Sequence, residues 1–262
     1  MRRVQQGFSL LELIGVMAVM AILAGALAPS VFQMLERGYQ DAEKKSLAAI
    51  ADSLSGYIRA NKAIPDENIN NWSTAVADFA ALPPQRVTLN DKNFQRRLYV
   101  DPNFFTTANQ VFPGYVQDLG LGSPPNSPRL MLISSLEGSV SPVLNTTARF
   151  GDVWQQSGSP VIVESDTVLI ERINLAGWFN RVVLTNSAGS QAGFLVEAGT
   201  EGAVAAASGG VDGVRTVYVL TDSRLGLNVA PYPGGVTQRQ LIVSRDVSLR
   251  YQTDGSSWFW GD

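Results

Sequence analysis

The sequence predicts an α+β protein in which one long N-terminal helix packs on an antiparallel β-sheet from the C-terminal part of the chain. Three observations predict this fold class: an apolar run near the N-terminus, a helical apolar periodicity after it, and segments rich in β-branched and aromatic residues near the C-terminus. The expected regions are a leader (1–7), a membrane-spanning helix (8–29), its amphipathic continuation (30–62), a variable region (63–159) and a β-sheet region (160–262).

The composition argues against several classes of function. The 262 residues include no cysteine and no histidine, which removes disulfides, thiolate sites and the commonest general base. We therefore expect no enzyme activity. The 20 basic and 23 acidic residues form no long run of one sign, so the sequence gives no strong indication of nucleic-acid binding.

The apolar run extends over residues 8–28 and contains one ionisable residue, Glu12. Its 21 residues would form a helix of about 31 Å, close to the hydrocarbon thickness of a bilayer. Arg2 and Arg3 precede the run, and the positive-inside rule then places the N-terminus in the cytoplasm. The chain after about residue 30 should lie across the membrane.

Two simpler interpretations of this run are a cleaved signal peptide and a plain membrane anchor. Ala26-Leu27-Ala28 fits an A-x-A cleavage site, but the run exceeds the usual signal core of about 7–15 residues, and Pro29 would follow the cut. A plain anchor leaves Glu12 unexplained, because a carboxylate inside a bilayer costs about 2.5–3.5 kcal/mol.

The stretch Gly7-Phe8-Ser9-Leu10-Leu11-Glu12-Leu13 resembles the cleavage and methylation signature of type IV prepilins and type II secretion pseudopilins. The resemblance covers residues 1 to about 60 and implies a pilin-like fold. It also implies that a prepilin peptidase cuts after Gly7 and methylates the new N-terminus at Phe8. An inner-membrane assembly platform would then polymerise the subunits, identical or mixed, into a filament.

The resemblance favours a structural subunit of a type IV pilus, because the short basic leader, Phe8 and Pro29 are similar to the type IVa class. The alternatives are a pseudopilin of a type II secretion system and a minor or tip pilin that acts as an adhesin. The precursor would lie in the inner membrane, in contact with lipid, with a periplasmic globular part. The mature subunit would join an extracellular pilus or a periplasmic pseudopilus. Many type IVa pilins carry a disulfide, which this chain lacks.

In this family, Glu12 would pair with the amino group that cleavage creates at Phe8. The amine of a neighbouring subunit would fix the axial stagger, since an unpaired carboxylate in a low-dielectric core is costly. The amine of the same chain, four residues away on the same helix face, is the other candidate partner. The sequence does not separate these two pairings.

After Pro29 the sequence becomes amphipathic. Apolar residues recur every three or four positions: Leu47, Ile50, Ala51, Leu54, Tyr57 and Ile58. The charged residues are expected to face solvent: Arg37, Asp41, Glu43, Lys44 and Lys45. Residues 8–61 would form one helix of about 80 Å that Pro29 interrupts. In a filament, residues 25–29 would either unwind or only bend.

Pro65 is expected to end the helix, and residues 63–158 read as mostly irregular, with a short helix at 71–82 and strands at 98–100 and 130–134. Residues 203–210 read as a flexible loop, with a weakly ordered strand edge as the alternative. The strands expected after residue 160 are 161–163, 168–173, 179–185, 193–197, 214–220, 241–243 and 248–252.

Three further groups of residues are candidate sites. Asp212 and Asp222, with the region of Asp152, are the calcium candidates, although no D-x-D-x-D-G loop is present and turn formation is the better interpretation. No other cofactor is expected. Arg96 and Arg97 read as a solvated surface pair, with contact to DNA or a partner as the alternative. Residues 257–260 read as a terminal strand with buried rings, with a receptor-binding patch as the alternative.

Overall fold

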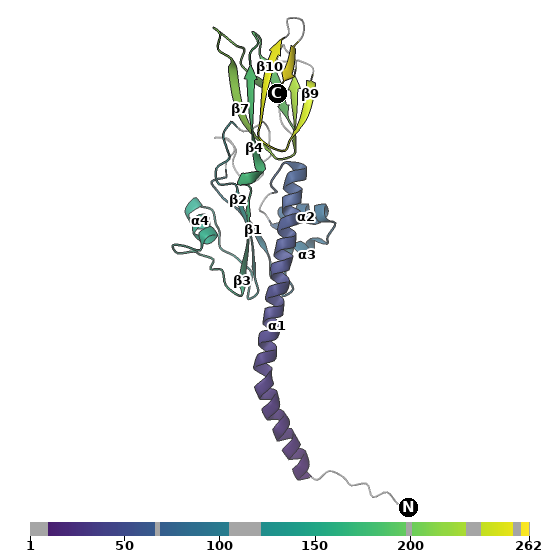
Figure 1. Ribbon diagram of the computed structural model, residues 1–262. Coiled ribbons are helices and arrows are strands. Elements are labelled where there is room, and N and C mark those ends of the chain that lie inside the picture. The colour runs from purple at the N-terminus through teal and green to yellow at the C-terminus, as the bar shows by residue number, and fades with distance from the viewer. Residues whose placement is uncertain are drawn as a thin grey trace, which may run out of the picture.

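The computed structural model describes residues 10–65, 69–104, 122–197, 201–228, 237–253 and 258–261. Figure 1 shows a long N-terminal helix that projects from a body with two parts: a layered part beside the helix and a β-sandwich beyond its C-terminal end. The α+β class and the long helix on an antiparallel sheet are thereby confirmed.

The helix α1 extends from Leu10 to Asn61, over 52 residues or about 78 Å. It continues through Pro29 without a break, contrary to the expected interruption. Figure 1 shows a smooth curvature instead. The residues around Pro29 are exposed, so a gentle bend can separate the ring from the preceding turn without disturbing any packing. Unwinding of residues 25–29 inside a filament stays a prediction.

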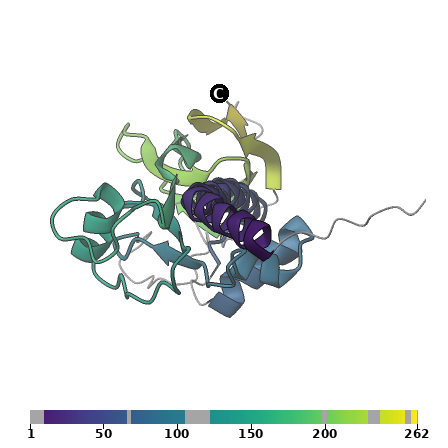
Figure 2. The ribbon, with the colours of Figure 1, turned by 90° about the horizontal axis from the view of Figure 1, so that it is seen from below.

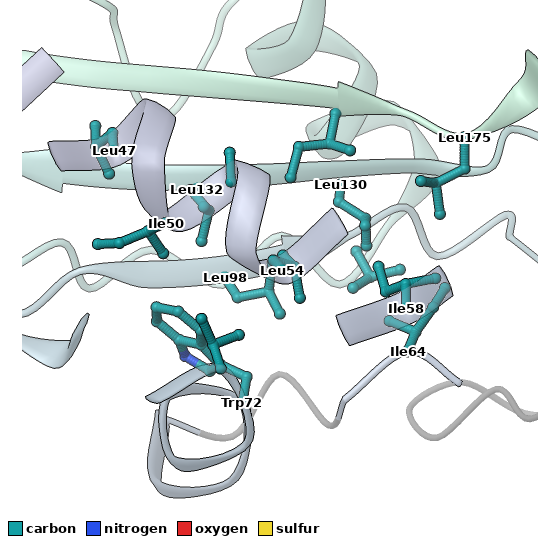
Figure 3. Close-up of a cluster of buried hydrophobic side chains, with 14 of the residues drawn as sticks. Leu47, Ile50, Leu54, Ile58, Ile64, Trp72, Leu98, Leu130, Leu132 and Leu175 are labelled. Carbon is teal, nitrogen blue, oxygen red and sulfur yellow. The ribbon is translucent and has the colours of Figure 1, made fainter. Parts of the chain in front are cut away.

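The C-terminal half of α1 packs on a three-stranded antiparallel sheet of order β1–β2–β3, formed by Arg97–Val100, Arg129–Ser135 and Val168–Asn174. One sheet face, with Leu98, Leu130 and Leu132, meets the apolar stripe of α1 in a single buried cluster (Figure 3). The stripe is the predicted one, and Leu47, Leu54 and Ile58 are at most 1% exposed. Because successive side chains of a β-strand point to opposite faces of the sheet, the other face of this sheet can pack against a second layer of structure.

That other face is covered by α4 (Thr147–Gln155), a helix that the sequence did not predict. Tyr99, Met131 and Ile133 from the sheet pack with Phe150 and Val153 of α4. α4 is capped at its start, because the Thr146 hydroxyl accepts a hydrogen bond from the backbone N–H of Arg149.

Two helices flank the sheet on the α1 side. α2 (Ile69–Ala80) confirms the helix expected near 71–82 and contributes the fully buried Trp72 to the main core. α3 (Pro84–Thr88) follows directly, starting with a proline, which has no backbone N–H to leave unpaired in the first turn.

The described residues after Trp178 form a β-sandwich. One sheet has the order β11–β10–β4–β7 and the other the order β6–β5–β8–β9. Within these sheets β10 pairs parallel with β4, and the other pairs are antiparallel. The strands are β4 (Phe179–Asn186), β5 (Ala192–Val196), β6 (Glu201–Val204), β7 (Gly213–Leu220), β8 (Ser223–Asn228), β9 (Thr237–Val243), β10 (Val247–Thr253) and β11 (Trp258–Gly261).

The sandwich has a core of its own, and this is the main difference from the expected single sheet. Val182, Leu184 and Phe194 point into a cluster that contains no α1 residue. Both sheets have an apolar inner face, so they bury these faces against each other rather than against the helix. The sheet on α1 instead takes β1 and β2 from the region expected to be mostly irregular.

Smaller differences concern single strands. Residues 161–163 form a loop, which the Gln156 side chain ties down through the carbonyl of Ile162 and the N–H of Glu164. The strand β8 was not predicted, because its glycine and polar residues weaken the β pattern. The strand β6 overlaps the start of the segment 203–210, for which a strand edge was the alternative to the favoured loop.

Candidate assembly surface

The N-terminal part of α1 is an uncovered apolar surface. The first buried side chain along the described part of α1 is that of Glu43, so residues 10–42 form about 50 Å of helix without a buried side chain among those described. Contact with the body begins near the end of this stretch, where the Tyr39 ring lies 5.3 Å from the ammonium of Lys92. No charged residue occurs between Leu13 and Leu35. The exposed large apolar side chains of this part are Leu10, Leu13, Ile14, Val16, Met17, Val19, Met20, Ile22, Leu23, Leu27, Val31, Phe32, Met34 and Leu35.

Such a surface needs an apolar environment. The α1 helix is long and apolar enough to cross a membrane, with a mean hydropathy of 2.2 in its most apolar window and none of that window buried. Its apolar side chains surround the helix instead of forming one stripe, which is typical of a helix in lipid or inside a bundle. We name residues 10–42 the free segment.

The residues of the predicted processing site lie at the start of this segment. Gly7 and Phe8 lie outside the described residues. The backbone of Glu12 belongs to α1, near the end farthest from the body, and its side chain lies outside the description. Both pairings of Glu12 therefore stay predictions.

A buried ion pair marks the point where the free segment joins the body. Glu43 and Arg96 were expected at the surface, yet their side chains are each only 3% exposed. The guanidinium of Arg96 donates from Nε and Nη2 to the two carboxylate oxygens of Glu43, at 2.6 and 2.7 Å. Opposite charges that are removed from water must pair in this way, and a bidentate arginine satisfies both oxygens at once.

The remaining donor capacity of Arg96 fastens the α3 segment to the helix. Nη1 donates to the carbonyls of Arg86 and Leu89 at 2.7 and 2.5 Å, and Nη2 also donates to the Ser46 hydroxyl at 3.0 Å. Glu43 precedes Leu47 by one helical turn on the buried face, and this position was the signal in the sequence that a buried carboxylate needed a partner.

A second polar contact fastens the other end of α1 to the sandwich. Lys62, which follows the helix with a φ of 53°, is only 4% exposed, and its Nζ donates to the carbonyl of Thr221 at 3.1 Å. Burial lowers the pKa of Lys62, while the negative charges of Glu197 and Asp222 act in the opposite direction.

The structure does not bring the two calcium candidates together. Asp212 and Asp222 flank the two ends of β7, whose eight residues span about 26 Å. Asp212 lies 3.5 Å from the guanidinium of Arg250, and Asp222 occupies a left-handed turn with a φ of 63°. Among the described residues, no group of three or more His, Cys, Asp or Glu side chains could hold a metal ion.

The aromatic C-terminal segment forms the expected strand, β11. Trp260 is 5% exposed, packs 5.1 Å from the ring of Tyr251, and donates from Nε1 to the carbonyl of Asn228. Ser257 lies outside the described residues. Trp260 therefore has a structural role in the sandwich core.

Comparison with known proteins agrees with the arrangement of α1. The family model for the prokaryotic N-terminal methylation motif matches residues 2–28. The chain is 26% identical over 98 residues to the type II secretion system core protein G of Escherichia coli (strain K12). The matched stretch covers 37% of this chain and 66% of core protein G, so the chain spans just under two thirds of the length of that relative. No solved structure matches this chain. The chain thus has the N-terminal methylation motif of prepilins and pseudopilins and is similar to a type II secretion pseudopilin.

Proposed function

We propose that this chain is a structural subunit of a type IV pilus, similar to the type IVa pilins. It is cleaved after Gly7, N-methylated at Phe8 and polymerised through α1. The observation that supports this best is the free segment: about 50 Å of uncovered helix, without a charged residue between Leu13 and Leu35, overlaps the methylation motif at residues 2–28. Before assembly the precursor lies in the inner membrane with its body in the periplasm, and the mature subunit then joins the filament.

The free segment suits both states of such a protein. In the membrane its side chains contact lipid, and in a filament they contact the helices of other subunits. Lipid tails and leucine side chains are about equally apolar, so moving between these environments brings little hydrophobic gain. Close packing and the pairing of Glu12 with an amino group would then select the assembled state.

The processing step is tested by mass spectrometry of the protein from membranes and from filaments. We expect a mature N-terminus at Phe8 that carries one added methyl group. The prepilin peptidase of the host should be required for both changes. A mature chain that starts at Met1 or at Pro29 would refute the proposal.

The assembly step is tested by Glu12→Ala. We expect the variant to enter the membrane normally and to form few or no filaments, because its helix lacks the carboxylate that pairs with the amine. Glu36→Ala is the matched control, since Glu36 is an exposed glutamate on the same helix. Normal filament numbers from Glu12→Ala would remove the role that we assign to this carboxylate.

A pseudopilin of a type II secretion system is the second candidate, and the similarity to core protein G favours it. The two candidates differ in where the filament lies and in what its loss prevents. A pilus subunit should appear among filaments sheared from the cell surface. A pseudopilin should stay in the periplasm, and deletion of its gene should stop the export of folded proteins.

A further inference from the structure

One sheet of the β-sandwich has a hollow in its outer face. In the sheet β6–β5–β8–β9, Phe194 and Leu225 point into the sandwich core. Because side chains alternate along a strand, the residues next to them face outward. The hollow has a volume of about 230 Å³, and its lining includes Leu195, Glu197, Arg224, Gly226, Thr237 and Gln240.

No helix in the described part of the chain covers this face. Figure 1 places α2, α3 and α4 beside α1 and below the sandwich. Figure 2, seen from below, shows the yellow strands of the sandwich apart from the blue and teal helices. Arg224, Thr237 and Gln240 are exposed, and Ile242, the cross-strand neighbour of Arg224, is 62% exposed. The hollow is therefore open to solvent, and a ligand can reach it.

Gly226 forms the floor of the hollow, although the backbone at this position does not require a glycine. Gly226 is not among the glycines with a positive φ. A Cβ on it would meet Thr237 Cγ2 at 3.5 Å and Leu195 Cβ at 3.6 Å, which are ordinary contacts. A glycine inside a strand often marks a place where a ligand approaches the backbone closely. Here any larger side chain would occupy the hollow.

A β-bulge directs Thr237 towards the hollow. The register of β8 and β9 shifts next to Asn228, so that Thr237 lies opposite Asn228 and Gln238 is the extra residue. Strict alternation along β9 would direct Thr237 towards the sandwich core, whereas the bulge directs it outward, beside Gly226. The Thr237 hydroxyl donates to the amide oxygen of Asn228 at 3.1 Å, and its own oxygen can still accept a hydrogen bond.

The other polar groups of the hollow differ in what they can bind. Within the described residues, neither the guanidinium of Arg224 nor the amide of Gln240 makes a hydrogen bond or an ion pair. The carboxylate of Glu197 accepts from the backbone N–H of Arg224 through Oε2 at 2.9 Å, so its other oxygen can accept from a ligand. A guanidinium only donates, a carboxylate only accepts and an amide does both. The charges of Arg224 and Glu197 also cancel, which suits a ligand without net charge.

We propose that this hollow binds one neutral sugar residue. A hydroxyl group both donates and accepts, so neighbouring hydroxyls of one ring can meet Arg224, Gln240 and Glu197 together. The apolar C–H face of the ring would lie over Gly226 and Leu195. The hollow is smaller than the about 300–1,000 Å³ of pockets for drug-sized ligands, which favours a single ring. The inference concerns one folded chain and does not rest on the proposed function.

The test measures sugar binding to the full chain by saturation-transfer NMR, in a detergent without a sugar head group. The probes are the methyl glycosides of glucose, galactose, mannose and N-acetylglucosamine, with glucuronate as the acidic comparison. We expect at least one neutral glycoside to bind saturably at millimolar concentration, and more tightly than glucuronate. Binding of none of the neutral glycosides, or equal or tighter binding of glucuronate, would overturn the inference.

Two sources of such a sugar are separated by an oligosaccharide that carries the best-binding sugar at its non-reducing end. Tighter binding of the oligosaccharide than of the single glycoside would assign the site to the end of a glycan chain. Equal or weaker binding would assign it to a free sugar.

Two variants connect the binding to the hollow. Gly226→Ala should weaken it at least about tenfold, because the added methyl group occupies the floor. Arg224→Met keeps a long side chain but removes the guanidinium, and should also weaken binding about tenfold. Gly189→Ala is the matched control, since Gly189 is exposed and its Cβ would meet nothing within 4 Å. Thermal melts like that of the parent show that the variants are folded. Unchanged binding by Gly226→Ala and Arg224→Met would place the sugar elsewhere and overturn the inference.

Discussion

Removing the carboxylate of Glu43 should strongly destabilise the body, and the geometry of the pair gives the size of the effect. In Glu43→Ala the guanidinium of Arg96 stays buried without its counter-charge. Breaking a buried ion pair by removing one partner costs about 3–5 kcal/mol. The carbonyls of Arg86 and Leu89 still accept hydrogen bonds from Arg96, so we expect the lower end of this range, about 3 kcal/mol.

Removing the other partner of the ion pair, Arg96, should lower the free energy of unfolding further. Arg96→Leu leaves the Glu43 carboxylate buried and also removes the donor to two backbone carbonyls, so we expect a loss of about 4–5 kcal/mol. The double variant should lose less than the sum of the two, because neither charge is then left alone. This sub-additivity distinguishes a true pair from two independent effects.

The assay is denaturant and thermal unfolding of the purified full chain in detergent, followed by tryptophan fluorescence. A loss of 3 kcal/mol should lower the midpoint temperature by about 6–12 °C in a protein of this size. Lys44→Ala and Lys45→Ala are matched controls, since both side chains are exposed, and each should change stability by less than about 0.5 kcal/mol. A loss below about 1 kcal/mol for Glu43→Ala would refute the reasoning.

Further predictions concern the core and the sandwich. In the folded state the pKa of Lys62 is lowered from 10.5. At pH values between the lowered pKa and 10.5 the unfolded chain therefore binds more protons than the folded chain, and the free energy of unfolding should rise with pH. Lys62→Met should lose this part of the rise when unfolding is measured as a function of pH. Gly213→Ala should destabilise the sandwich by at least about 1–3 kcal/mol, because its Cβ would lie 2.0 Å from the carbonyl oxygen of Ala205. Gly226→Ala, whose nearest atom is at 3.5 Å, should be nearly neutral in the same thermal melt. Leu54→Ala should cost about 2–5 kcal/mol, measured by denaturant unfolding, because Leu54 is fully buried between α1 and the sheet.

Much of the fold follows from local patterns in the sequence. The apolar stripe of α1 has a clear helical period, and β3, β4 and β7 have runs of β-branched residues, so these elements were predicted close to their observed bounds. α4 was missed because its sequence TARFGDVWQ has two buried apolar residues, too few to establish a period. β8 was missed because Gly226 and its polar neighbours interrupt the alternation.

Part of the candidate assembly surface can be predicted from the sequence, and part is visible only in the folded chain. The apolar run, the glycine–phenylalanine step and Glu12 are contiguous, so the sequence reveals them together. The partner of Glu43 is 53 residues away, and no local pattern distinguishes Arg96 from the adjacent Arg97. Only the folded chain shows which of these two arginines is removed from water.

By itself, the sequence determined that this protein has a membrane-length helix with a methylation motif and an α+β body. These features depend on residues that are neighbours in the chain, and their chemistry is visible without knowing the fold. The tertiary structure alone decided which sheet α1 packs on, and that the C-terminal strands form a separate sandwich beyond the helix end. Those outcomes depend on how distant apolar faces share buried surface, and a pattern within one segment does not specify its partner.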